Sequence, residues 1–147
     1  MDDNHLKIKN YWKDGFLFPI DIFTQNEASK LREELEDIED KYKTDPSLPM
    51  PINTYKRINS QCVMPLASKI ALNTKILDIV EKIIGKNILL WSVEFFIKEQ
   101  GSKSIVSMHQ DLTYWGLSDN ELQVTAWIAL SPSNKNSGCM DFVKESF

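Results

Sequence analysis

His109 and Asp111 are the residues whose types and spacing could carry out chemistry. They lie in the sequence Met108-His109-Gln110-Asp111, within a stretch whose composition predicts a β-strand. Residues two apart in a strand project from the same face, so this imidazole and this carboxylate are expected to point together. Such a pair can supply two corners of a facial triad of two histidines and one carboxylate, a donor set that suits iron(II).

A structural explanation of the same pair stays open on spacing alone. A strand histidine beside an aspartate is commonly a hydrogen-bonded pair that binds no metal. Gln110 lies between the two residues and is expected on the opposite face of the strand, which favours either support of the two side chains from behind or a structural role.

The elements that must position this pair begin with helices. Thr24-Gln25-Asn26-Glu27 has the form of a capping box and is followed by apolar residues at spacings of three and four, which predicts an amphipathic helix over residues 27–43. Pro46, Pro49 and Pro51 then predict a loop. Two more helices are expected over residues 65–72 and 76–84, the second capped by Asn73 or Thr74 and ended by Gly85.

From Asn87 onward the pattern changes, because β-branched and aromatic residues predominate. Strands are expected over residues 88–97, 105–112, 122–130 and 139–143. Helices followed by several strands predict an α+β domain, with a helical part over about 1–86 packed on an antiparallel sheet formed by about 87–147.

Three motifs in this second part agree in order and spacing with one known family. They are Met108-His109-Gln110-Asp111-Leu112-Thr113-Tyr114-Trp115-Gly116, then Val124-Thr125-Ala126-Trp127-Ile128-Ala129-Leu130-Ser131-Pro132, and Ser137-Gly138-Cys139-Met140. Together they resemble the phytanoyl-CoA dioxygenase family, specifically over residues 91–143 and more loosely over the helices. The resemblance implies a double-stranded β-helix, or jelly roll, of which only the first strands are present.

The resemblance also implies an activity and a set of site residues. Members of the family use iron(II), 2-oxoglutarate and O₂ to hydroxylate a small organic substrate, with release of succinate and CO₂. His109 and Asp111 are then the metal ligands. Asp111 favours hydroxylation over halogenation, because related halogenases have a small residue at this position.

The same resemblance places other residues near the site, each with a plainer alternative. Trp127 lies where the family has a tryptophan near the co-substrate, although a core or interface aromatic explains it at least as well. Thr113, Tyr114 and Trp115 are expected at the substrate mouth, and packing on the rim of the barrel is the alternative. Lys98 is expected to be a solvated lysine at a strand end.

The second histidine and the co-substrate arginine of the family come from a later strand, and no matching residues are found. The sequence contains 2 histidines, and the other, His5, lies in a polar N-terminal segment and is expected to have no metal role. These residues are therefore expected to be an inactive, partial sequence that binds iron weakly. The alternative is a non-catalytic jelly-roll binding or structural domain that has lost its metal site.

Composition limits the partners. The net charge is −4 and the basic residues are scattered, so nucleic acid is not expected as a partner. The longest apolar runs are far shorter than the ~20 residues that span a membrane. With no secretory signal pattern at the N-terminus, the expected location is cytoplasmic. Cys62 and Cys139 lack metal or redox spacing and are expected to be reduced thiols.

Overall fold

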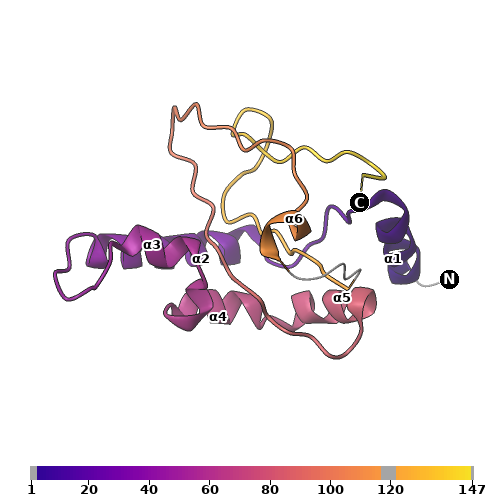
Figure 1. Ribbon diagram of the computed structural model, residues 1–147, viewed down its shortest axis with the longest axis horizontal. Helices are drawn as coiled ribbons and strands as arrows, with labels where there is room; N and C mark the ends of the chain where they lie inside the picture. The colour runs from indigo at the N-terminus through magenta and orange to yellow at the C-terminus, as the bar shows by residue number, and fades with distance from the viewer. Residues whose placement is uncertain (1–2, 117–121, 147) are drawn as a thin grey trace.

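The computed structural model describes residues 3–116 and 122–146, with side chains described from Ile8 onward within these ranges. Figure 1 shows a group of helices in the first part of the chain, followed by long loops that a short helix interrupts. The elements in chain order are α1 (Asp3–Asp14), α2 (Gln25–Tyr42), α3 (Ile52–Arg57), the 3₁₀-helix η1 (Ser60–Cys62), α4 (Pro65–Ala71), α5 (Thr74–Ile84) and α6 (Leu112–Trp115).

The three helices expected from the sequence are confirmed, because their end signals are local. Thr24 is the N-cap of α2, and it forms the full capping box with Glu27. Helix α4 begins at Pro65, whose missing N–H costs nothing in the first turn. Asn73 accepts a hydrogen bond from the Lys75 backbone N–H at the start of α5, and Gly85 ends that helix with a φ of 88°.

The core lies between α2 and α4. Leu31 and Leu35 of α2 are buried, as are three residues of α4, of which Leu66 is 1% exposed and Ala67 is 0% exposed. Later segments pack against this cluster through partly buried apolar side chains, which are Val93, Phe95, Ile128 and Leu130. The second of the three sequence motifs is therefore attached to the helical core through Ile128 and Leu130.

The expected antiparallel sheet is wrong for the part of the chain that the structure describes, since no strand occurs in residues 3–116 or 122–146. Residues 92–95, which were expected to pair with another strand, bond to a helical turn instead. Ser60 donates its backbone N–H to the Val93 carbonyl at 2.9 Å, and the Phe95 N–H bonds to the Lys56 carbonyl at 2.8 Å. The α+β jelly-roll assignment is thus replaced by helices and irregular chain.

The physical reason is that a strand needs a partner at ladder distance, whereas β-branched and aromatic composition is a property of one segment. The Val93 carbonyl and the Phe95 N–H form their hydrogen bonds with residues of η1 and α3. The Val93 N–H also bonds to a side chain, the Oε1 of Gln61, at 2.8 Å. Composition alone therefore could not distinguish these extended segments from strands.

The last described residues return to the end of α1, as Figure 1 shows. The Glu145 backbone N–H donates to the Asp14 carbonyl at 3.1 Å, and Lys144 Nζ lies 3.3 Å from the Asp14 carboxylate. The Phe16 and Phe142 rings also pack together with their centroids 5.2 Å apart. Among the described residues, no helix is long and apolar enough to cross a membrane.

Removal of the Thr24 hydroxyl should destabilise the protein. Thr24→Ala eliminates the bond that the Glu27 N–H makes to Oγ1, and loss of such an N-cap typically costs about 1 kcal/mol of unfolding free energy. Urea denaturation measures this cost, with Thr24→Ser as the control that keeps the hydroxyl. Equal stability of the alanine and serine variants would contradict the role of the cap.

The buried Lys56 should make stability depend on alkaline pH. Burial lowers the pKa of this ammonium, which pairs with Glu39 of α2, below its usual 10.5, although the charge of Glu99 acts in the opposite direction. The unfolded chain then binds more protons than the folded one, so stability rises as the pH increases toward 10.5. In Lys56→Met this part of the rise should be absent.

The measurement is urea denaturation at neutral and at mildly alkaline pH. Lys69→Met is the matched control, because the Lys69 side chain is 62% exposed and its ion pair with Glu34 lies at the surface. If Lys56→Met and the wild type gain stability equally between the two pH values, Lys56 does not have the lowered pKa.

Candidate metal centre

The side chains of His109 and Asp111 lie together at the start of α6. His109 Nε2 is 3.3 Å from Asp111 Oδ1, and the two side chains are 34% and 38% exposed. Asp111 is the N-cap residue of α6 and has helical dihedral angles, with φ −56° and ψ −41°. The pair is therefore formed by a turn into a helix, and the expected mechanism, alternation along a strand over residues 105–112, is wrong.

The orientation of the imidazole is set by a backbone carbonyl. His109 Nδ1 lies 2.7 Å from the carbonyl oxygen of Ser107. A carbonyl only accepts hydrogen bonds, so Nδ1 carries the proton and donates it. In the neutral imidazole the lone pair is then on Nε2, the atom that faces Asp111. Metal-binding histidines commonly donate their second ring N–H to a carbonyl or carboxylate in this way.

The carboxylate of Asp111 is anchored by a residue from the second motif. Thr125 Oγ1 donates to Asp111 Oδ2 at 2.6 Å. Aspartate at an N-cap usually accepts from the N–H groups of the first turn, yet the Asp111 side chain makes no capping bond to α6. Its second oxygen, Oδ1, is thereby left facing the imidazole.

The spacing of Nε2 and Oδ1 fits two neighbouring ligands of one metal ion. Adjacent ligands about 2.1 Å from an octahedral ion lie roughly 3.0 Å apart, compared with the 3.3 Å between these atoms. A neutral imidazole and a carboxylate present two lone pairs to each other, which is unfavourable without a proton or a metal cation between them. One nitrogen and one oxygen donor suit iron(II).

The donor set is incomplete among the described side chains. Within them, no group of three or more histidine, cysteine, aspartate or glutamate residues could hold a metal. The side chain of the second histidine, His5, lies outside the described residues, so its expected lack of a metal role is not tested. The structure thus brings together two of the three ligands expected for a facial triad.

Of the three residues expected at the substrate mouth, Tyr114 contacts the pair. Its ring meets the His109 imidazole edge to face, with centroids 5.5 Å apart and an interplanar angle of 81°. Thr113 and Trp115 belong to the same short helix. Their place, with that of Tyr114, in a substrate-binding site stays a prediction.

Trp127 lies two residues after Thr125 and is 47% exposed, so it is not a core aromatic of the described structure. Its expected role beside the co-substrate is untested. Lys98 is exposed, which agrees with the expected solvated lysine, and the end of its side chain lies against Gly138 of the third motif. Gln110 donates from Nε2 to the Ser146 carbonyl, away from the pair, which agrees with a structural role.

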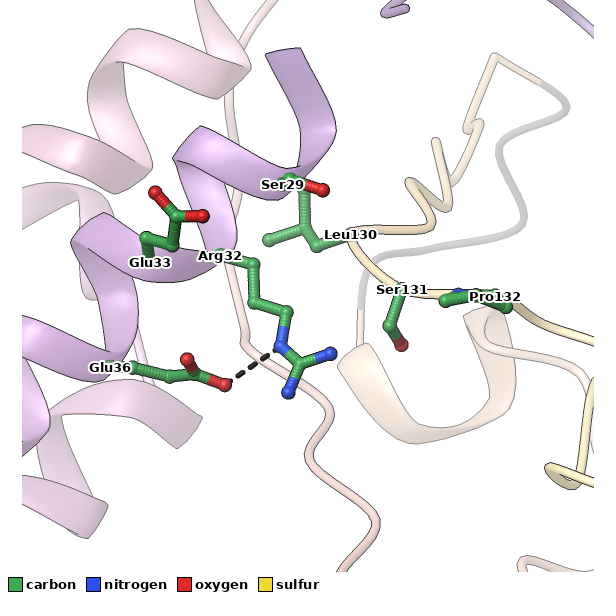
Figure 2. A pocket seen from close by; sticks show the side chains of 7 residues that line it. All are labelled: Ser29, Arg32, Glu33, Glu36, Leu130, Ser131 and Pro132. Atoms are coloured by element: carbon green, nitrogen blue, oxygen red, sulfur yellow. Dashed lines mark hydrogen bonds and ion pairs between the residues drawn. The ribbon is translucent and has the colours of Figure 1, made fainter. Parts of the chain in front are cut away.

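A surface hollow lies elsewhere, between α2 and residues 130–132 (Figure 2). It has a volume of about 180 Å³, and its lining includes neither His109 nor Asp111. Arg32 projects along it and is paired through Nε with Glu36 at 2.7 Å. This hollow therefore does not hold the residues expected to bind substrate.

Comparison with known proteins supplies the family. The family model described as phytanoyl-CoA dioxygenase (PhyH) matches residues 11–146. The chain belongs to the phytanoyl-CoA dioxygenase family. No curated protein and no solved structure matches the chain. At the level of class, phytanoyl-CoA dioxygenase family members are iron(II)- and 2-oxoglutarate-dependent oxygenases that act on small molecules with O₂.

The sequence did not reveal two groups that contact His109 and Asp111 in this phytanoyl-CoA dioxygenase family member. The Ser107 carbonyl has no signature in the sequence, because every residue has a backbone carbonyl. Thr125 lies inside the second motif, but a threonine among β-branched residues indicates a strand-forming residue. The motif contains two hydroxyl residues, Thr125 and Ser131, and nothing in the sequence distinguishes the one that bonds to Asp111.

The contact between Tyr114 and His109 should be visible in solution. Tyr114→Ala removes the ring, so the carbon-bound protons of the His109 imidazole should lose a ring-current shift. Tyr114→Phe keeps the ring and should keep the shift. Proton NMR resolves this directly because the sequence contains 2 histidines, and His5 serves as the internal control. Unchanged His109 signals in the alanine variant would disprove the contact.

Proposed function

We propose that this phytanoyl-CoA dioxygenase family member is a non-haem iron(II), 2-oxoglutarate-dependent dioxygenase that hydroxylates a small organic substrate. His109 and Asp111 bind the iron through Nε2 and Oδ1. The observation that carries the proposal is the pair of facing acceptor atoms at 3.3 Å, each with its side chain anchored on the other side. The family match over residues 11–146 supports the same chemistry at the level of class.

Each residue has a limited role in this proposal. The bound iron and 2-oxoglutarate supply the oxidising chemistry. His109 keeps its Nε2 lone pair toward the metal position while the Ser107 carbonyl fixes the ring. Asp111 contributes negative charge through Oδ1. Tyr114 covers one side of the imidazole, and with Thr113 and Trp115 it lines the approach of the substrate.

Trp127 completes the proposed assignment as a neighbour of 2-oxoglutarate. Its exposure of 47% leaves its ring accessible to a bound molecule. The second histidine ligand and an arginine for the far carboxylate of 2-oxoglutarate are not provided by residues 1–147 in this proposal. These residues by themselves should therefore bind iron(II) weakly and give no turnover.

The alternative is a non-catalytic binding or structural domain that has lost the metal site. The incomplete donor set among the described side chains favours it. In that case the His109 and Asp111 pair is a salt bridge with a protonated imidazole. Metal binding separates the two functions, because the salt bridge has no preference for iron(II).

Anaerobic titration with iron(II) tests the proposal. His109→Ala and Asp111→Ala should each weaken iron(II) binding by at least roughly tenfold, since even groups behind the ligands commonly contribute that much. His5→Ala and Asp78→Ala are the matched controls, the latter at an exposed position of α5, and both should bind like the wild type. Equal binding by all five proteins would support the non-catalytic alternative.

Turnover gives the second measurement. Incubation with iron(II), 2-oxoglutarate and O₂ should produce succinate only from a form of the protein that also supplies the second histidine and the arginine. Such a form should lose succinate production in His109→Ala. Activity that survives this substitution would exclude His109 as a ligand.

A further inference from the structure

The hydrogen bond between Thr125 and Asp111 is the strongest unexplained contact near the candidate metal centre. It joins residues 14 apart in sequence, at an oxygen–oxygen distance of 2.6 Å. A hydroxyl that donates to a carboxylate at this distance forms a charge-assisted bond, roughly twice as strong as a neutral one. This contact fixes one carboxylate oxygen and leaves the other free.

The bond with Thr125 sets the orientation of the Asp111 carboxylate. The N–H groups of α6 that a capping side chain would bond are already occupied, because the Thr113 N–H donates to the Gln110 carbonyl and the Tyr114 N–H to the Asp111 carbonyl. The structure has no such capping bond, and Oδ2 accepts from Thr125 instead. The orientation held by Thr125 is the one in which Oδ1 faces His109 Nε2.

Thr125 can hold the carboxylate because its own segment is fixed to the core. Ile128 and Leu130 follow it closely, and both pack against the cluster that contains Leu31 and Leu66. Thr125 itself is exposed, so its side chain is not required to fill the core. Its hydroxyl therefore links the position of the helical core to the position of the carboxylate.

We infer that Thr125 is a positioning residue for the metal-binding carboxylate: its hydroxyl holds Asp111 in the orientation that binds the cation together with His109. The inference rests on the proposed function, because it assumes that the pair binds a divalent ion. Loss of the hydroxyl frees the carboxylate to rotate away from His109 Nε2. The metal then loses a preset ligand, while the folded structure remains.

The test compares three substitutions in the full chain. Thr125→Val removes the hydroxyl and keeps the shape, Thr125→Ala removes both, and Thr125→Ser keeps the hydroxyl. The two hydroxyl-free variants should bind iron(II) roughly tenfold more weakly in anaerobic titration, the usual effect of removing a group that orients a ligand. Thr125→Ser should bind like the wild type. Thr44→Val, at an exposed position after α2, is the matched control for the chemical change.

Two further readouts separate positioning from a general loss of structure. The visible absorption spectrum of bound cobalt(II) reports the ligand geometry, and it should change in Thr125→Val but not in Thr125→Ser. Thermal unfolding reports stability, and a merely structural Thr125 would lower the unfolding temperature without changing metal affinity in the folded protein.

The outcomes distinguish this inference from the proposed function. If the wild type binds iron(II) no better than Asp111→Ala, the proposed function fails. If the wild type binds better than Asp111→Ala but Thr125→Val binds equally well, the pair is a metal site and the role of Thr125 is wrong. Weak binding by Thr125→Ser would overturn the inference as well, because that variant retains the hydroxyl.

Discussion

The packing of α2 against α4 is the interaction on which the rest of the structure depends. Leu31 and Leu35 of one helix and Leu66 and Ala67 of the other form most of the buried cluster. Two later segments, at residues 93–95 and 128–130, gain their fixed positions by packing against it. Each buried leucine contributes about 1.5–3 kcal/mol through removal of apolar surface from water. Among the described residues, the loops that carry His109 and Asp111 have no comparable core of their own, so their geometry derives from this one.

The segments after α5 expose many more of their large apolar side chains than the helices of the core do. Many large apolar side chains after α5 lie at the surface, for example Leu89 at 84% and Ile105 at 89%. The partly buried Val93 and Phe95 instead bond through their backbones to η1 and α3. The helices were predictable from the sequence because their signals act within four residues, as at Thr24 and Glu27. The predicted strands were wrong for the described residues, because a strand forms only when a second segment lies beside it.

The candidate site was also predictable only in its local features. The types and spacing of His109 and Asp111 identified them as a pair, and the structure brings them within 3.3 Å. The sequence predicts a strand for these residues, whereas the chain forms a turn into α6. The Thr125 hydroxyl came from a segment 14 residues away, and a contact of that kind is decided by tertiary packing. Sequence thus indicated which side chains could bind a cation but not which groups orient them.

The small stability expected of an exposed ion pair supports the proposed metal site at His109 and Asp111. Both side chains are about one third exposed, and exposed ion pairs typically contribute only about 0.2–1 kcal/mol to stability. Folding alone therefore gives little reason to anchor Nδ1 on the Ser107 carbonyl and Oδ2 on Thr125. Both anchors act on the atoms that face away from the partner, and both leave an acceptor pointed inward. That arrangement lowers the reorganisation needed to bind a cation, since the two donor atoms are already close to adjacent ligand positions.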